Sequence, residues 1–436
     1  MFRKILAILC VCALLPVFGE AVSLAASTPA QGRYQLTKVL VLSRHNLRSP
    51  IGTSTQSLTP HTWFSWTSGP GELSLRGGQL ETIMGQYFRK YLVSEGLITE
   101  NEQPQAGEML FYANSFQRTI ATAQYFSSGL LPVANVRIEH RLAVGEMDPV
   151  FASRLMFMSD AYSAAVREQL QVMGADAELG GIGKKLAANY QLLEQVLDLR
   201  HSTAAKSQGL DHFRTDGPEL EFLLGDAPGV CSSSLQLAIN ASDALVLQYY
   251  EEADPQKAAF GHRLTEQEWR EISWIKDLGM DMCCAAPLVA VQTAHPLLQL
   301  MQQELSLADR KFTFICGHDS NLVSVLAALE VKPYILPQSV EAHTPIGGKL
   351  VIEKWLGRDG QEYASLSLVY QSTEQLRQRT ILSLDNPPMR YPLELKGLAK
   401  NADGLYLFRE VQQRFQKALD AYDTQAALAQ PAKPAA

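Results

Sequence analysis

Cysteine is scarce in this sequence. Only six of the 436 residues are cysteines, and two of these precede residue 20. The spacing of the other four fits no zinc motif, so we expect no structural zinc site. Cys316 lies in an apolar run and is expected to be a buried core residue. A disulfide from Cys231 to Cys283 or Cys284 is an open alternative if the protein is exported.

An excess of positive charge is also absent. The formal net charge is −7 at pH 7, which argues against nucleic acid or an anionic membrane surface as the main partner. A small anionic substrate stays compatible with this composition, because a pocket can be locally basic within an acidic protein. The composition leaves the oligomeric state open.

Long apolar runs are rare. A run over residues 5–18 follows Arg3 and Lys4 and precedes small residues at 23–26, which is typical of a secretory signal peptide over residues 1–26. A membrane anchor is the less favoured alternative, since a span needs about 20 apolar residues. Lipid attachment at either early cysteine is disfavoured by the bulky residue before it. We therefore expect a periplasmic or secreted protein that is not inserted in a membrane after cleavage.

The chain after this segment begins with strands and helices in alternation. Apolar, β-branched residues predict strands over 38–43, 109–113 and 136–139. Helical periodicity predicts helices over 75–95 and from about residue 116. Alternating strands and helices indicate an α/β fold with a mostly parallel sheet flanked by helices.

Helical patterns dominate from residue 148 to residue 303, and strand patterns return afterwards over 311–316, 349–355 and 365–370. The sequence therefore predicts a discontinuous α/β domain with a smaller inserted helical domain. The predicted α/β domain comprises residues 27–147 and 304–424, and the helical insertion comprises residues 148–303. Residues 425–436, rich in Ala, Pro and Gln, are predicted to be a disordered tail.

One cluster of charged residues follows the first predicted strand. Arg44 and Arg48 flank His45 within five residues. Guanidinium groups match phosphate oxygens in geometry and charge, and a neutral imidazole between them could attack phosphorus. Taken alone, the segment is more typical of a solvated basic turn whose histidine is hydrogen-bonded.

Two further segments carry similar chemistry. His318 and Asp319 follow a buried strand, where the first could donate a hydrogen bond to phosphate and the second could protonate a leaving group. Asp319 or Ser320 is also suited to capping the next helix. Arg118 lies early in a helix, whose first turn favours anions, although alone it is an ordinary surface arginine.

Together these segments resemble the histidine acid phosphatase branch of the histidine phosphatase superfamily. Its motifs R-H-G-x-R-x-P, a mid-chain Arg and a distal H-D are similar to R-H-N-L-R-S-P at 44–50, N-S-F-Q-R-T at 114–119 and G-H-D-S-N at 317–321. The departure is Asn46 in place of Gly, which Asn accommodates if the turn is left-handed. Within the family, the glucose-1-phosphatases also share similar segments at 147–149, 247–251 and 344–349.

The resemblance implies a role for each matching residue. His45 would be the nucleophile, forming a covalent phosphohistidine, and Asp319 the proton donor. The phosphate would be bound by four side chains: Arg44, Arg48, Arg118 and His318. It implies no metal and no cofactor, because guanidinium groups stabilise the charge, and it implies activity at acid pH.

The implied substrate is a small phosphomonoester, such as a sugar phosphate similar to glucose 1-phosphate, or phytate. Two alternatives stay open at this point. One is a phytase with inositol hexakisphosphate as its main substrate, and the other is a non-catalytic protein that binds phosphate esters. The remaining histidines show no metal-binding spacing and are expected to be structural or on the surface. For His343 alone, an approach to the pocket is left open.

Overall fold

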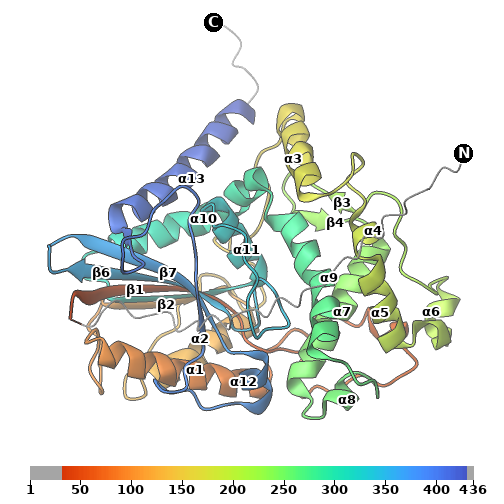
Figure 1. Cartoon of the computed structure of the whole chain (residues 1–436), viewed down its shortest axis with the longest axis horizontal. Coiled ribbons are helices and arrows are strands. Elements are labelled where there is room, and N and C mark those ends of the chain that lie inside the picture. The colour runs from red at the N-terminus through yellow and green to blue at the C-terminus, as the bar shows by residue number, and fades with distance from the viewer. Residues whose placement is uncertain (1–31, 430–436) are drawn as a thin grey trace, which may run out of the picture.

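The computed structural model describes residues 32–429. The predicted signal peptide lies outside the described residues. The main sheet follows the order β2-β5-β1-β6-β7-β8, and β9 pairs with β7 (Figure 1). Its strands are β1 (Tyr34–Arg44), β2 (Met109–Ala113), β5 (Phe312–Gly317), β6 (Lys349–Gly357), β7 (Glu362–Tyr370), β8 (Met389–Pro392) and β9 (Tyr406–Leu407).

The expected α/β class is confirmed, and the sheet is mixed rather than mostly parallel. Strands β2, β5 and β1 are parallel, as the alternation of strands and helices predicts. Strands β6 to β9 pair antiparallel. The reason is local, because only four residues, 358–361, connect β6 to β7, and so short a connection allows only a hairpin. The predicted strand at 136–139 contributes a single bridge between Tyr112 and Glu139.

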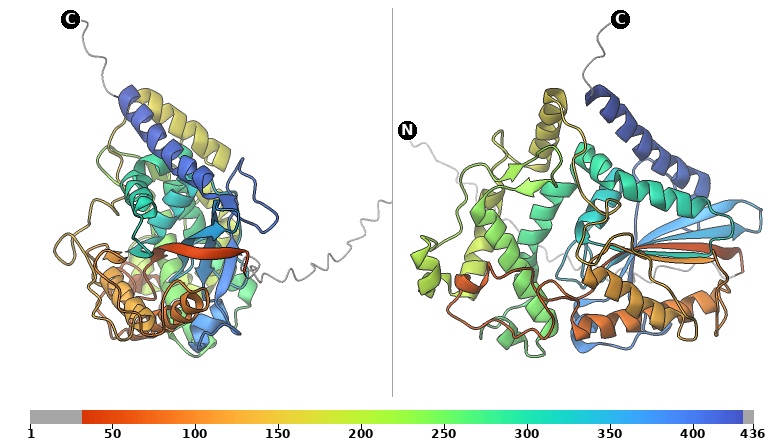
Figure 2. Two further views of the ribbon diagram at one scale, coloured as in Figure 1. Left: turned by 90° about the vertical axis from the view of Figure 1, so that its left-hand side faces the viewer. Right: turned by 180° about the vertical axis from the view of Figure 1, so that it is seen from behind.

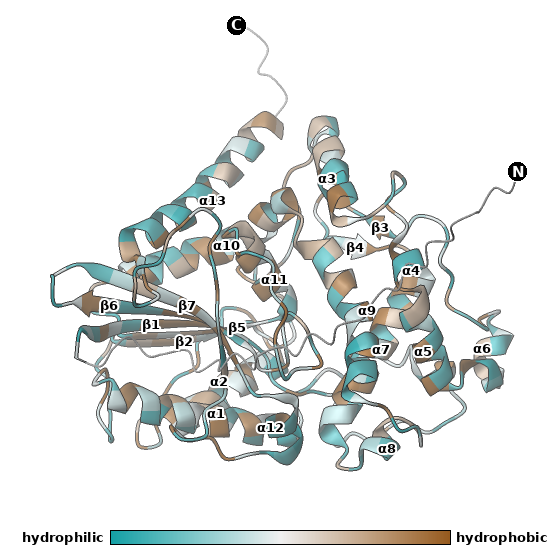
Figure 3. Cartoon of the chain, viewed as in Figure 1, coloured by the Kyte–Doolittle hydropathy of each residue, from teal (hydrophilic) through white to brown (hydrophobic). Residues whose placement is uncertain are grey.

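Helices cover both faces of the sheet. On one face, Val39 and Val41 of β1 share a buried apolar cluster with α1 and α2. On the other face, Leu40 and Leu42 share a cluster with α10, α11 and α13, as expected for a strand whose side chains alternate between faces. Figure 2 shows these helices above and below the strands, and β1 and β2 are largely brown in Figure 3. The helices are α1 (Leu75–Ser94), α2 (Gln117–Leu130), α10 (Pro287–Ser306), α11 (Asp319–Ala328), α12 (Thr373–Gln378) and α13 (Phe408–Ala429).

A second group of helices lies beside the sheet (Figure 1). Its core is a separate apolar cluster that includes Tyr190, Leu245 and Trp269. Its elements are α3 (Asp160–Met173), α4 (Ile182–Lys185), α5 (Ala187–Leu197), α6 (Thr203–Ser207), α7 (Ser233–Glu251), α8 (Pro255–Ala258) and α9 (Glu266–Cys284), with the short strands β3 (Leu220–Glu221) and β4 (Gly229–Val230). Two 3₁₀ turns span Gln56–Leu58 and Leu199–His201.

Three details bear on the sequence predictions. Residues 425–429 belong to α13, so the prediction of a disordered tail is wrong for them, and residues 430–436 lie outside the described residues.

The four described cysteines are free thiols, so the disulfide alternative is not formed, whereas Cys316 is buried as expected. Among residues 32–429 no single helix is long and apolar enough to span a membrane. Helices α9 and α10 reach that length only together, across a bend of 84°.

Candidate active site

The parallel strands bring the three charged segments to one edge of the sheet. Arg44 at the end of β1 pairs in register with Gly317 of β5, and Ala113 of β2 pairs with Cys316 of β5. The backbone continues this register past the strand ends, since the His45 N–H donates to the Gly317 carbonyl at 3.0 Å. The residues that follow β1, β2 and β5 therefore meet at the carboxyl edge, where open α/β sheets bind ligands.

His45 is buried and presents one free ring nitrogen. Its Nδ1 lies 2.9 Å from the carbonyl oxygen of Asn46, so Nδ1 carries the proton and donates it, and Nε2 keeps its lone pair. Burial, followed by the charges of Arg118, Arg48 and Arg44, lowers the pKa of His45 well below its usual range. The imidazole is therefore neutral at acid pH, which is the form that can attack phosphorus.

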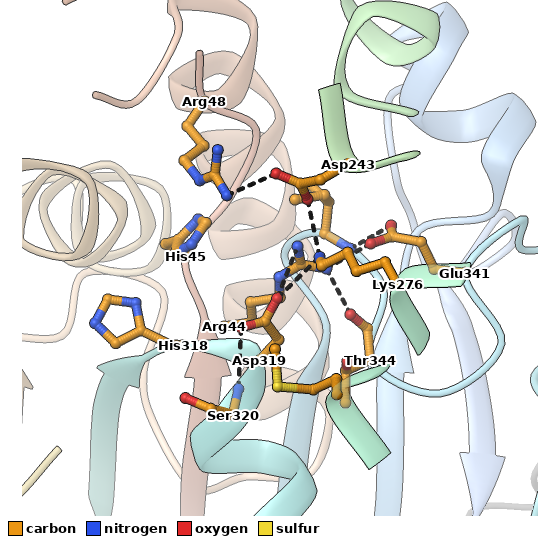
Figure 4. Close-up of polar contacts among 12 residues, drawn as sticks. Arg44, His45, Arg48, Asp243, Lys276, His318, Asp319, Ser320, Glu341 and Thr344 are labelled. Atoms are coloured by element: carbon orange, nitrogen blue, oxygen red, sulfur yellow. Dashed lines mark hydrogen bonds and ion pairs between the residues drawn. The ribbon is translucent and has the colours of Figure 1, made fainter. Parts of the chain in front are cut away.

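Arg44 is fully buried and fixed by its neighbours (Figure 4). Its NH1 donates to Glu341 at 2.5 Å and to the Thr344 carbonyl at 2.6 Å. Its NH2 lies 3.3 Å from Asp319 Oδ2. The Ile346 N–H in turn donates to Glu341 at 2.8 Å, which holds that carboxylate in place. Arg44 thus supplies a charge whose position is set by contacts within the protein.

Arg48 and Arg118 are held less completely. Arg48 donates to the Ser49 carbonyl and to Asp243, both at 2.9 Å. Arg118 stacks on the Phe116 ring, with 4.7 Å between its guanidinium carbon and the ring centroid. The Nε of each is buried without a hydrogen-bond partner in the described residues, as are Nε and Nη2 of Arg44. Both guanidinium groups therefore retain N–H groups that could donate hydrogen bonds to an anion.

His318 lies edge-on to His45, with 5.6 Å between ring centroids. Its Nε2 is 2.7 Å from the Asn114 side-chain amide, so Nε2 accepts and Nδ1 carries the proton. Burial and the charge of Arg118 lower the pKa of His318 to about 3. A neutral His318 can donate a hydrogen bond through Nδ1, as the sequence predicts. His318, not Asp319 or Ser320, is the cap of α11.

Asp319 is held as a carboxylate in this structure. Its Oδ1 accepts from the Ser320 N–H at 3.0 Å, and its Oδ2 lies 2.9 Å from Lys276 Nζ. Burial alone would raise the pKa of Asp319, but Lys276 and Arg44 outweigh it and hold this pKa well below the usual range. The expected proton donor is therefore ionised in this arrangement of charges.

Asn46, which stands where the family motif has Gly, is explained by its side-chain contacts and not by the left-handed turn that was considered from the sequence. It is not among the described residues with positive φ, so no left-handed turn requires it. Its amide donates to Glu81 at 2.6 Å, and Glu81 pairs with Lys349 at 2.8 Å, with both charged side chains fully buried. Gly347, at φ +65°, passes so close that a Cβ there would lie 2.5 Å from the Asn46 amide nitrogen. Asn46 thus ties the loop after His45 to α1 and β6.

Sequence reasoning missed three charged residues of the site: Asp243, Lys276 and Glu341. Asp243 on α7 and Lys276 on α9 come from the group of helices beside the sheet, and Glu341 comes from the loop before β6. Asp243 was detectable as the one charged residue between Leu235 and Tyr250 of an otherwise uncharged helical segment. His343 pairs with Asp281 at 2.9 Å and with none of the phosphate-binding candidates.

A neutral histidine ringed by guanidinium groups, with a carboxyl group beside it, is an arrangement suited to the transfer of phosphoryl groups through histidine. The comparison with protein families agrees. The chain belongs to the histidine phosphatase superfamily, branch 2, which matches residues 35–371. The expected class, a histidine acid phosphatase that hydrolyses phosphate esters, is confirmed.

Known relatives match over most of their length. A glucose-1-phosphatase of Providencia rettgeri is 35% identical over 95% of this chain and 99% of its own. A glucose-1-phosphatase of Salmonella typhimurium is 37% identical over 87% and 91%, respectively. The structure of a Hafnia alvei phytase in complex with myo-inositol hexakis sulphate superposes with a TM-score of 0.79 at 27% identity, covering 89% of this chain and 98% of that one.

Proposed function

We propose that the protein is an exported acid phosphomonoesterase that acts through a phosphohistidine on His45. The single observation that carries this proposal is the state of the His45 ring. Its Nδ1 is committed to the Asn46 carbonyl, and its Nε2 is free in a buried site. Three guanidinium groups, those of Arg44, Arg48 and Arg118, act on this ring and favour its neutral form.

The proposed reaction has two steps. The lone pair of His45 Nε2 attacks phosphorus, the bond from phosphorus to the ester oxygen breaks, and protonated Asp319 gives its proton to the leaving alkoxide. Water then attacks the phosphohistidine, Asp319 takes a proton from that water, and the bond from nitrogen to phosphorus breaks to release orthophosphate. Arg44, Arg48, Arg118 and the Nδ1–H of His318 stabilise the equatorial oxygens in both steps.

For the substrate, we propose small sugar phosphates similar to glucose 1-phosphate. The support is the identity of 35% and 37% to two glucose-1-phosphatases. A phytase is the second candidate, favoured by the likeness to a phytase that binds an inositol hexakis sulphate. We further propose that residues 148–303 form the inserted domain that shapes the leaving-group side, and that residues 1–26 direct export to the periplasm or medium.

The test is hydrolysis of p-nitrophenyl phosphate at about pH 5 in the presence of EDTA, a pH at which unperturbed His is charged. Wild type and His45→Ala are compared, with His140→Ala as the control, because His140 is exposed and its ring bonds to the Leu142 carbonyl and not to a candidate site residue. We expect activity that survives EDTA and is lost only in His45→Ala. Loss of activity in EDTA, or activity in His45→Ala, would contradict the mechanism. A comparison of kcat/KM for glucose 1-phosphate and phytate then decides between the two substrates.

A further inference from the structure

A chain of ion pairs crosses the site between its two sides (Figure 4). Arg48 NH2 contacts Asp243 Oδ2 at 2.9 Å, Asp243 Oδ1 contacts Lys276 Nζ at 3.0 Å, and Lys276 Nζ contacts Asp319 Oδ2 at 2.9 Å. The chain ends on Arg44, 3.3 Å from the same Asp319 oxygen. Lys276 therefore lies between two carboxylates, and only one of them is the candidate proton donor.

The two carboxylate oxygens of Asp319 have different neighbours. Its Oδ1 is occupied by the N–H of Ser320 in the first turn of α11. Its Oδ2 is the oxygen that could protonate a leaving group, and it is the oxygen that both Lys276 and Arg44 contact. Two cations within 3.3 Å of this oxygen oppose its protonation, so the binding of a proton there requires one cation to move away. Arg44 is anchored by Glu341 and Thr344, which leaves Lys276 as the cation that can move.

The charges around Asp319 show what would move Lys276. Four cations face the site, and the three carboxylates include Asp319 itself. The titratable and charged groups are Arg44, His45 and Arg48 from β1 and its loop, Arg118 from α2, Asp243 from α7, Lys276 and Cys284 from α9, His318 beside Asp319, and Glu341 from the loop before β6. A phosphate dianion would compete with Asp243 for Arg48. It would also change the net charge of the groups around the site from positive to negative.

We propose that Lys276 is a positioning residue that makes protonation of Asp319 depend on phosphate binding. In the arrangement described here, Lys276 holds Asp319 as a carboxylate. When the dianion takes Arg48, the carboxylate of Asp243 is released and draws Lys276 to itself. Asp319 Oδ2 then binds a proton from solvent, and this proton is the one passed to the leaving group. The inference rests on the phosphatase function proposed above.

The test compares pH profiles of Lys276→Met and Lys276→Arg with wild type, using one substrate so that its own titration cancels. The basic limb of the kcat/KM profile reports the pKa of the proton donor in the free enzyme, and the basic limb of the kcat profile reports its pKa in the enzyme–substrate complex. In Lys276→Met we expect the kcat/KM limb to move to higher pH by about one unit or more, and the kcat limb to move much less. Lys276→Arg keeps the charge and should retain the wild-type profile.

Other outcomes of this comparison would overturn the inference. A uniform loss of rate with unmoved limbs would mean that Lys276 is only structural, and a uniform rise in KM would mean that it only binds substrate. Equal movement of both limbs would mean that Lys276 stays on Asp319 in the complex. If Lys276→Arg behaves as Lys276→Met, charge is not the cause.

A second measurement needs no Lys276 variant. Inorganic sulfate is a tetrahedral dianion that does not titrate at about pH 5 and can stand in for phosphate. Calorimetry in buffers of different ionisation enthalpy should show uptake of about one proton when sulfate binds wild type, and none in Asp319→Asn. Absence of uptake in wild type, or uptake that persists in Asp319→Asn, would refute the proposal. Activity in His45→Ala would instead refute the phosphatase mechanism, so the two failures can be distinguished.

Discussion

The two sides of the site are held in different ways. On the sheet side, the loop after β1 is buried, and its backbone and side chains bond to β5, to α1 and to the loop before β6. On the helical side, Asp243 and Lys276 reach the site through side-chain ion pairs alone, with 16% and 12% of their side-chain surface exposed. The comparison indicates that the phosphate-binding side is set before substrate arrives, whereas the side that faces the leaving group can rearrange.

The largest expected effect comes from breaking the fixed side at Arg44. Arg44→Met leaves the buried carboxylates of Glu341 and Asp319 short of a cation, so we expect a loss of about 3–5 kcal/mol of unfolding free energy and at least about 10²-fold in kcat. Denaturant unfolding and steady-state kinetics measure both. Arg118→Met is the matched control and should lose similar activity but less than about 1 kcal/mol, because Arg118 has no ion pair in the described residues. Equal destabilisation by both variants would contradict the comparison.

The buried ion pair of Glu81 and Lys349, which lies beside the loop after β1, offers a second way to disrupt the sheet side of the site. Lys349→Met leaves Glu81 as an unpaired buried charge next to Asn46, with an expected cost of about 3–5 kcal/mol. The double variant Glu81→Gln/Lys349→Met should recover part of this loss, because no uncompensated charge stays in the interior. Lys332→Met, which breaks the exposed pair with Glu394, should cost less than about 1 kcal/mol. Chemical denaturation distinguishes these values, and a double variant no better than Lys349→Met would be inconsistent with this reasoning.

A smaller effect is expected on the side that rearranges. Asp243→Asn removes the carboxylate that competes with phosphate for Arg48, so sulfate should inhibit this variant about tenfold more strongly, a change of about 1.4 kcal/mol. At the same time kcat should fall, because Lys276 loses the group that draws it from Asp319. Inhibition constants and kcat measured together test this. Weaker sulfate inhibition would show that Asp243 supports phosphate binding instead of opposing it.

A further effect is expected on the pH dependence of stability. The folded protein lowers the pKa of His318 to about 3 through burial and Arg118, whereas an unfolded histidine binds a proton below about pH 6.5. The unfolded state therefore binds more protons below pH 6.5, and stability falls as the pH falls from there towards 3. His318→Asn should reduce this slope by up to about 1.4 kcal/mol per pH unit, and exposed His140→Asn should not. Unfolding free energies at several pH values between 4 and 7 provide the test.

Sequence patterns predicted the sheet side of the site well and the helical side poorly. Arg44, His45 and His318 each follow a buried, β-branched strand, and the carboxyl ends of parallel strands meet at one edge, so the sequence alone was enough to bring these three residues together. The antiparallel strands were misread because β6 and β7 look like any buried strands, and their direction depends on a four-residue turn. Lys276 was not found, since a single lysine on an amphipathic helix normally lies on a solvated face, and only tertiary packing turns it inward.

The most direct test of the phosphohistidine mechanism is to trap the covalent intermediate. Wild type is mixed with a ³²P-labelled phosphomonoester at acid pH and quenched rapidly with alkali, which preserves phosphohistidine. The protein is then digested and the labelled peptide is sequenced by mass spectrometry. We predict one phosphoryl group on the peptide that contains His45, and none in His45→Ala. Turnover without a labelled peptide, or a label on another residue that persists in His45→Ala, would contradict this mechanism.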